Sequence, residues 1–579
     1  MIPKTNAPVR IVNQLPAKPK KPRRPRSPRQ RSDTGRARLA VAALAFLMVY
    51  AVIGARLMTY AMDADGLAFA DRRGSTGESA ARPDLVDRNG QILATDLISP
   101  SLYAEPNKIL NLDDAVDKLS AVLPDLGTEE LTEKLGSDRK FIWLKRDLTP
   151  RQEAAVHDLG LPGLGFRRET RRVYPSGRTA SHILGAVNVD NRGIAGIEKY
   201  IDDQGLAELH GLGFATDHNQ MPVALSIDLR AQHAMRHELV AAMEKFRAKA
   251  ASGILMDVHT GEVVSMVSLP DYDPNDPETA LRPEAINRLT TGVYEMGSTF
   301  KTMTVAMALD TGRITLEDRY DARRPLRVAN FTINDYHAQR RILTVPEIFV
   351  YSSNIGSARM ALDVGIDGQK EFLKRLGMLD RMETELPENA APLYPHEWKQ
   401  LSAMTIAFGH GISIAPIQLA TAAVAMANGG TYIPPTFLKR SRADAEKLGH
   451  PVLRHETSEA MRYLMRLNVE RGTARKADRL GYRLGGKTGT AEKAINGRYA
   501  KNKLLTSFLG TFPTDDPRYV ILVVLDEPKG SEETHGYATS GWNAAPTAGN
   551  IVERVAPILG VLPRVEEGEP EDSAIFVSY

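Results

Sequence analysis

Cysteine is absent from the 579 residues of the chain. Its absence excludes a disulfide framework, a thiol nucleophile and any zinc or iron–sulfur site with cysteine ligands. A strong overall charge is absent as well, because the chain has 74 Lys and Arg residues and 71 Asp and Glu residues, which gives a net charge of +3. No internal repeat is visible. The chemistry must therefore be carried by other side chains, and a chain of this length is expected to form about three or four units.

Acidic residues are almost missing from the first 38 positions, which hold twelve Lys or Arg residues and only Asp33 as an acid. Proline is frequent there and apolar side chains are too few to build a core, so residues 1–38 are predicted to be a basic tail. Aromatic residues are absent from the same stretch, and no nucleic-acid motif occurs in it. We therefore expect the tail to face anionic lipid and not nucleic acid.

One long stretch lacks charge altogether, from Leu39 to Ala55. Its seventeen residues lie at the short end of what spans a bilayer, and residues 39–58 are predicted to be a transmembrane anchor. The dense Lys and Arg residues before it predict a cytoplasmic N-terminus, with everything beyond about residue 60 outside the inner membrane. A buried core helix and a cleaved signal peptide are the alternatives, but the long basic segment ahead of the run argues against both.

The remainder is predicted to form two regions, a non-catalytic one over 64–228 and a larger one over 229–563, followed by an acidic tail over 564–579. In the first region, Asn89-Gly90 predicts a hairpin turn because both residues tolerate positive φ. The second region is expected to contain a hairpin, three later strands and a closing helix. These elements are predicted over Ser252–Val258 and Glu262–Leu269, over Leu484–Glu492, Leu504–Thr511 and Tyr519–Asp526, and over Ala544–Leu559.

The first chemical motif is Ser298-Thr299-Phe300-Lys301, preceded by a glycine and followed by a helical pattern. Ser298 is predicted at the start of a helix, where backbone N–H groups favour developing negative charge. Lys301 follows one turn later and so lies on the same face as the hydroxyl. A lysine deprotonates a serine only when its own pKa is lowered by burial or by a neighbouring cation. Alone, the motif is weak and is more typical of a capped surface helix than of a catalytic site.

Two further motifs occur downstream in the chain. Ser352-Ser353-Asn354 offers a hydroxyl that can pass a proton and an amide that can hold Lys301 and a substrate, although the same pattern is common at helix starts. Lys487-Thr488-Gly489-Thr490 lies in a predicted strand whose small residues let a ligand backbone lie alongside it. Lys487 offers a cation for a carboxylate and for lowering the pKa of Lys301. A glycine-rich turn before an edge strand is the alternative for this motif.

In this order, the three motifs resemble those of the penicillin-binding protein transpeptidases. Stretches outside them are similar to class B of that family, among them Leu269–Asn275, Tyr294-Glu295 and, upstream, Asp87–Gly90, Arg172–Pro175 and Gly196-Ile197-Glu198. The resemblance implies an α+β fold with an antiparallel sheet between helical layers, an N-terminal pedestal domain and one transmembrane helix. Two positions depart from the family pattern. Met296 stands where many relatives carry proline, and Arg82-Pro83 stands where an Arg-Gly pair is usual.

The resemblance also implies roles for these residues. Ser298 would be the nucleophile and Lys301 its base, with Ser352, Asn354 and Lys487 completing the catalytic set. Thr488, Gly489 and Thr490 would bind the substrate, a peptidoglycan stem peptide, and β-lactams would acylate the same serine. No metal and no organic cofactor are expected. By the same resemblance, the partners would be a lipid-linked glycan polymerase of the FtsW type and other division proteins.

Several alternatives stay open at this stage. Asp526-Glu527-Pro528 and Gly541–Pro546 are more similar to the division type (FtsI-like) than to the elongation type. A β-lactamase or β-lactam sensor, a D,D-carboxypeptidase and an inactive division scaffold remain as rivals on the same fold. Three histidines, His337, His410 and His535, show no ligand spacing, and His410 is predicted to be a loop residue without a role.

Overall fold

The structure is a computed structural model that describes residues 82–205, 215–216, 219–328, 331–495 and 498–564, with a few residues between 44 and 53. The chain divides into two units, residues 1–78 and 79–579, and the second carries every element discussed below. The predicted basic tail, nearly all of the predicted anchor and residues 565–579 of the acidic tail lie outside the described residues. No helix in the described part of the chain has both the length and the apolar character to cross a bilayer.

A five-stranded antiparallel sheet forms the centre of the larger region, with the strand order β11-β10-β20-β19-β18. Its strands are β10 (Ala250–Asp257), β11 (Val263–Leu269), β18 (Gly485–Ile495), β19 (Arg498–Phe512) and β20 (Tyr519–Asp526). The predicted hairpin is thus confirmed as β10 and β11, and the three predicted later strands are confirmed as β18, β19 and β20. The strands β18 and β19 are longer than predicted because residues 493–495 of β18 also pair with residues 498–500 of β19. This extension of β19 is called the β19 arm.

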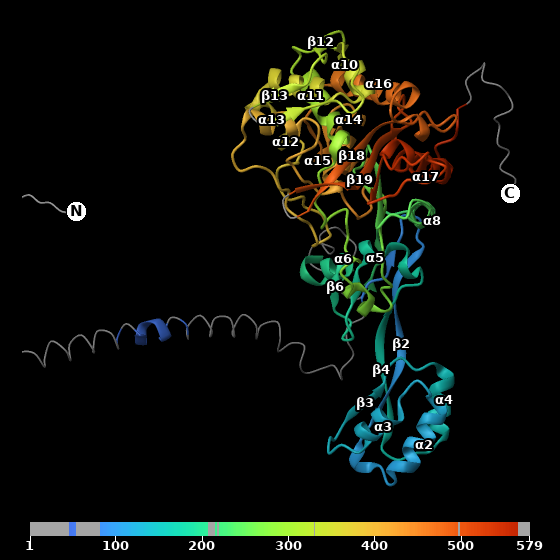
Figure 1. Cartoon of the computed structure of the whole chain (residues 1–579). Coiled ribbons are helices and arrows are strands. Elements are labelled where there is room, and N and C mark those ends of the chain that lie inside the picture. The colour runs from blue at the N-terminus through green and yellow to red at the C-terminus, as the bar shows by residue number, and fades with distance from the viewer. Residues whose placement is uncertain are drawn as a thin grey trace, which may run out of the picture. The chain divides into compact units, whose positions relative to one another are not determined.

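Helices cover both faces of this sheet, as the arrangement in Figure 1 shows. The central strand β20 is buried along its whole length, and alternate side chains point to opposite faces. Val520, Leu522 and Val524 enter one hydrophobic core, whereas Ile521, Val523 and Leu525 enter the other. The sheet between helical layers that the sequence predicts is therefore confirmed.

Different helices build the two cores. The second core is closed by α8 (Leu229–Lys245) and by α17 (Ala544–Ile558), the predicted closing helix. The first core holds α9 (Lys301–Asp310), α14 (Pro416–Ala427) and α16 (His455–Arg471). The side chain of Asp228 caps α8 by accepting hydrogen bonds from Arg230 N and Ala231 N. The boundary predicted between residues 228 and 229 coincides with this helix start and stays a prediction.

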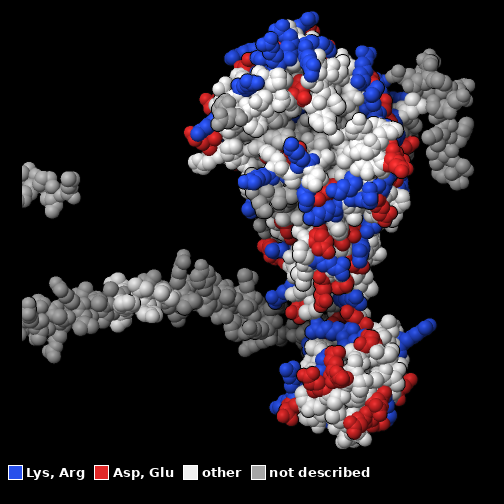
Figure 2. All heavy atoms as spheres, in the orientation of Figure 1, with Lys and Arg blue, Asp and Glu red and all other residues white. Residues whose placement is uncertain are grey.

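The N-terminal region is built around a ribbon of two long strands, β2 (Ile92–Ala104) and β4 (Leu164–Val173). The ribbon leads to a lobe with its own core and three helices, and acidic and basic side chains are interspersed over the lobe's surface (Figure 2). These helices are α2 (Leu112–Val122), α3 (Thr128–Leu135) and α4 (Pro150–Asp158). The short strands β1 (Leu85–Val86), β3 (Ile142–Lys145) and β9 (Val223–Ala224) complete the sheet. The predicted turn is confirmed between β1 and β2, with Gly90 at φ 84°.

A buried ion cluster lies where the ribbon meets the rest of the region. The carboxylate of Glu198 is fully buried and binds Arg172 Nε at 2.7 Å and Arg82 Nε at 2.9 Å. Arg172 also reaches Asp96 at 3.1 Å and donates a hydrogen bond to the carbonyl of Pro83. Burial opposes the charge of Arg172, but Glu198 and Asp96 outweigh it and raise the pKa of Arg172. Arg82-Pro83, the departure from the family pattern, therefore takes part in the cluster through a side chain and a carbonyl.

Arg172→Met is expected to destabilise the protein by about 3 kcal/mol, because it leaves the buried Glu198 with only Arg82 as a cation partner. The matched control is Arg171→Met on the same strand, whose arginine is 43% exposed and pairs with Asp147 at 3.4 Å. Exposed pairs of this kind are worth about 0–1 kcal/mol. Thermal unfolding followed by circular dichroism measures both variants, and an equal loss in the two would contradict the prediction.

Candidate active site

The predicted nucleophile, Ser298, lies in a single 3₁₀ turn, Gly297–Phe300, that runs directly into α9. The prediction of a helix start thus holds with one correction, because the α-helical hydrogen bonding begins only at Lys301. Gly297 has φ 55°, and a Cβ at this residue would stand 3.0 Å from the carbonyl oxygen of Thr490. Only glycine combines this backbone conformation with so close an approach. The turn that carries Ser298 is therefore pressed against strand β18.

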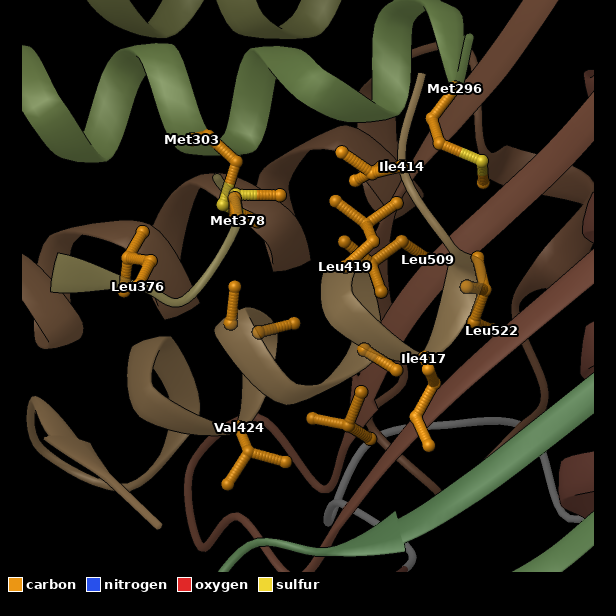
Figure 3. Close-up of a cluster of buried hydrophobic side chains, with 14 of the residues drawn as sticks. Met296, Met303, Leu376, Met378, Ile414, Ile417, Leu419, Val424, Leu509 and Leu522 are labelled. Carbon is orange, nitrogen blue, oxygen red and sulfur yellow. The ribbon is translucent and has the colours of Figure 1, made fainter. Parts of the chain in front are cut away.

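Apolar side chains on both sides of the turn hold it in the core. Met296 precedes the turn and Met303 lies one turn into α9, and both are buried. Figure 3 shows these two side chains entering the cluster formed with Ile414, Leu419 and Leu509. Met296, one of the two expected departures from the family pattern, thus contributes packing to the first core.

Lys301 is completely buried, and its amine contacts only neutral oxygens. Nζ donates to the carbonyl oxygen of Ser352, to Ser352 Oγ at 3.0 Å and to Asn354 Oδ1 at 2.7 Å. Burial lowers the pKa of Lys301 well below the usual lysine value, the charge of Lys487 lowers it further, and Asp335 opposes both. The amine is therefore available as a base at a lower pH than an ordinary lysine.

The second motif forms a two-residue connection between the helices α10 (Val345–Tyr351) and α11 (Asn354–Val364). Ser352 adopts the left-handed conformation, with φ 59° and ψ 45°, which costs a non-glycine residue about 1 kcal/mol. Such a conformation persists only where neighbouring contacts enforce it. Here, Ser353 caps α11 by accepting from Gly356 N and donates to Asp335 at 2.7 Å. The strained backbone turns both Ser352 oxygens toward Lys301.

Asp335 anchors this connection, although no motif in the sequence marks it as a site residue. Its carboxylate also accepts from Ile355 N at 2.9 Å, and the neighbouring carbonyl of Asn334 accepts from Asn354 Nδ2 at 2.8 Å. The side chain of Asn354 is thus held between Lys301 and Asn334. No local pattern around Asp335 signals this contact, because its partners lie 18 to 20 residues away in the chain.

The third motif lies on β18, which pairs with β19 alone among the strands that the structure describes. An edge strand can accept an extended ligand as an additional strand. Lys487 is completely buried beside the ring of Phe349, and burial lowers the pKa of its amine to about 7. A Cβ at Gly489 would stand 2.7 Å from the carbonyl of Met296. The glycine therefore lets the strand and the nucleophile turn touch, a role that the substrate-binding prediction did not include.

The two threonines of this motif are fixed by hydrogen bonds. Thr488 Oγ1 lies 2.6 Å from the hydroxyl of Thr473, and Thr490 Oγ1 accepts from Ser540 N at 3.1 Å. Thr473 and Ser540 are further residues of the site that no sequence motif marks. Thr473 is 15 residues from Thr488 in the chain and Ser540 is 50 residues from Thr490, so only the fold brings these partners together.

His410 lies closer to the site than the sequence predicted. It is half-buried, its ring packs 5.7 Å from that of Tyr499, and burial lowers its pKa while Glu295 opposes this effect. Glu295, three residues before Ser298, accepts hydrogen bonds from Tyr499 Oη at 3.0 Å and Gly411 N at 2.7 Å. This carboxylate thus connects the segment before the nucleophile to the β19 arm and to the loop 409–411.

Three sequence-distant motifs therefore meet at one place. Hydrogen bonds join Lys301 to Ser352 and Asn354, the charge of Lys487 acts on Lys301, and close backbone contacts join the Ser298 turn to β18. The other two histidines singled out in the sequence pack against rings, His337 on Tyr336 and His535 on Trp542. Within the described ranges, no group of His, Asp and Glu residues is arranged to hold a metal ion. The arrangement brings the turn of Ser298 together with two buried lysines of lowered pKa, Lys301 and Lys487.

Family models match most of the chain. The penicillin binding protein transpeptidase domain matches residues 251–553, and the penicillin-binding protein dimerisation domain matches residues 77–204. The three motifs all lie within the first match, and the ribbon and its lobe lie within the second.

Named relatives and a solved structure agree with these matches. The chain is 42% identical over 500 residues to the "Probable peptidoglycan D,D-transpeptidase FtsI" of Caulobacter vibrioides, covering 85% of this chain and 83% of the relative. It is 30% identical over 517 residues to the "Peptidoglycan D,D-transpeptidase FtsI" of Escherichia coli K12, covering 84% and 85%. The crystal structure of penicillin binding protein 3 from Mycobacterium tuberculosis, complexed with aztreonam, superposes with a TM-score of 0.64 at 21% identity. It covers 84% of this chain and 98% of that one, which shows the shared fold.

If Lys487 holds the drug's carboxylate, acylation by a penicillin is expected to slow as the pH rises through about 7, because burial lowers the pKa of Lys487 to about 7 and its amine then loses its positive charge. The second-order acylation rate constant reports groups of the free enzyme and is measured across pH with fluorescent penicillin. Lys487→Arg should move this alkaline decline to higher pH, since a guanidinium keeps its charge. Lys501→Arg, at an exposed position of β19, is the control. A decline that stays in place in Lys487→Arg, or shifts equally in both variants, would refute the assignment.

Proposed function

The chain belongs to the class B penicillin-binding proteins, and on that basis we propose that it is a peptidoglycan D,D-transpeptidase that works through an acyl-enzyme on Ser298. One observation carries the assignment of roles. The buried amine of Lys301 has a lowered pKa and contacts Ser352 and Asn354 but no acid in the described part of the chain. A structural lysine gains little from such surroundings, whereas a general base needs them.

Acylation begins when the hydroxyl of Ser298 attacks the penultimate D-Ala carbonyl of a stem peptide. Lys301 takes the hydroxyl proton as the oxygen–carbon bond forms. The carbon–nitrogen bond to the terminal D-Ala then breaks, and the proton passes from Lys301 through Ser352 to the departing amine. The 3.0 Å distance between Lys301 Nζ and Ser352 Oγ supports this relay.

Deacylation by an amine of a neighbouring stem peptide reverses these steps. The amine attacks the ester carbon, gives up its proton along the same path, and a new amide bond forms as Ser298 regains its hydrogen. The cross-link is then complete, and the enzyme returns to its starting protonation state.

Substrate binding falls to β18 in this proposal. The donor peptide would lie along this edge strand, with its carboxylate near Lys487, Thr488 and Thr490 and with Gly489 leaving room for its backbone. The N–H groups of Ser298 and Thr490 would stabilise the oxyanion, an interaction worth about 3 kcal/mol in other acyl transferases. The contact of the Ser298 turn with Thr490 supports this pairing, because it brings the two backbone segments together.

The septal role rests on the names of the relatives, and we place the protein in cell-wall synthesis during division. We further propose that residues 39–58 anchor it in the inner membrane by a single span, with residues 1–38 in the cytoplasm and the catalytic region in the periplasm. Its partners would be a lipid-linked glycan polymerase of the FtsW type and other division proteins. The uncharged run Leu39–Ala55 and the basic residues before it support this topology.

Intact-mass analysis after penicillin treatment tests the proposal. The wild-type chain is expected to gain the mass of one penicillin molecule, and Ser298→Ala is expected to gain none, because it removes the hydroxyl that is proposed to form the acyl-enzyme. Ser137→Ala, in the lobe of the N-terminal region, is the control and should be labelled like the wild type. An adduct on Ser298→Ala, or none on the wild type, would overturn the assignment of the nucleophile.

A further inference from the structure

Arginine gathers on one exposed face of the catalytic region. Two acids, Asp321 and Asp335, and six arginines occur between residues 319 and 341. The arginines, all exposed, are called the arginine patch: Arg319, Arg323, Arg324, Arg327, Arg340 and Arg341. Figure 2 shows Lys and Arg side chains gathered where Figure 1 places the strands β12 (Arg319–Asp321) and β13 (Leu326–Val328).

Backbone pairing keeps the arginine patch together. Strand β12 pairs with β15 (Ile342–Thr344), and Ala322 N donates to the carbonyl of Arg341 at 3.2 Å. Strand β13 pairs with β14 (Phe331–Ile333), which places Arg327 opposite Thr332. The arginines from the two ends of the segment therefore share one surface.

Most of this charge is not compensated. Arg323 pairs with Asp321 at 2.8 Å and Arg341 with Glu347 at 2.8 Å. Arg319, Arg324, Arg327 and Arg340 form no ion pair with any residue that the structure describes. Like charges held this close repel one another and create a positive potential over the surface. An ordinary solvated face mixes both signs, as the N-terminal lobe does.

Exposed rings lie among these arginines. Phe331 is 47% exposed, Tyr336 is 78% exposed, and the guanidinium of Arg341 stands 5.7 Å from the ring centre of Tyr351. Exposed rings beside cations suit a ligand that has both apolar faces and negative groups. A surface whose arginines only kept other molecules away would have no use for exposed aromatic rings.

The arginine patch also borders the active site on a defined side. From β14 the chain runs directly into Asn334 and Asp335, which bind Asn354 and Ser353. The patch therefore adjoins the Ser352–Asn354 side of the site, whereas the proposed donor peptide lies along β18. In the proposed mechanism, the incoming amine gives up its proton through Ser352 and so approaches from this side.

We propose that the arginine patch binds the acceptor, a glycan strand that carries carboxylate-bearing stem peptides, and holds it beside Ser352. The inference rests on the proposed function and names where its second substrate is held. Guanidinium groups suit this ligand because they bind carboxylates in a bidentate geometry. The sugar rings supply the apolar faces that exposed aromatic side chains contact.

The test compares two triple charge reversals in the full chain, held in zwitterionic nanodiscs. The first is Arg324→Glu, Arg327→Glu and Arg340→Glu in the arginine patch. The matched control is Arg139→Glu, Lys140→Glu and Arg151→Glu in the N-terminal lobe, where all three side chains are exposed and the net charge changes equally. Each protein is sedimented with purified peptidoglycan sacculi, and separately with phosphatidylglycerol vesicles, over a range of salt concentrations. Penicillin acylation is measured on the same samples.

The patch variant is expected to bind sacculi about tenfold more weakly than the wild type at low salt. Its binding should also depend less on salt, because the exposed charges of the arginine patch attract the ligand at long range and salt screens this attraction. The control variant should bind sacculi like the wild type, and both should be acylated normally. Equal weakening in the two variants, no weakening in the patch variant, or wild-type binding to vesicles but not to sacculi would each overturn the inference. A wild type that is not acylated would instead refute the proposed function.

Discussion

The burial of Lys301 among neutral oxygens is the constraint on which the site depends. A buried lysine is costly as a cation, and nothing acidic in the described chain pairs with this one. Its environment includes a second buried lysine, Lys487, which adds to the cost and lowers the pKa of Lys301 further. Two large hydrophobic cores on either side of the sheet supply the stability that such an arrangement requires.

Glycines allow the backbone segments of the site to touch. Gly297 meets Thr490 of β18, Gly489 meets the carbonyl of Met296, and a Cβ at Gly409 would stand 2.1 Å from the oxygen of Gly297. A side chain at any of the three would push the nucleophile turn away from its neighbours. The position of Ser298 is therefore set by backbone packing on two sides, while Glu295 ties the adjacent chain to the β19 arm.

Charged side chains are buried and paired in one part of the protein and exposed and unpaired in another. In the N-terminal region, Glu198 is buried and two arginines compensate it, which joins three segments of chain into one rigid cluster. In the catalytic region, four arginines of the arginine patch stay exposed and uncompensated. The buried cluster stabilises the fold, whereas the exposed arginines remain available to bind a negatively charged partner.

The sequence by itself determined the three motifs, the hairpin β10–β11, the strand β20 with its predicted bounds and the turn at Asn89-Gly90. These features follow from local periodicity and turn chemistry, which neighbouring residues carry. Only the tertiary structure decided that Asp335 anchors Ser353, that Glu295 and Tyr499 meet beside a half-buried His410, and that the pKa of Lys487 falls to about 7. Burial and contacts between residues far apart in the chain depend on how the sheet and helices pack, and no local pattern encodes them.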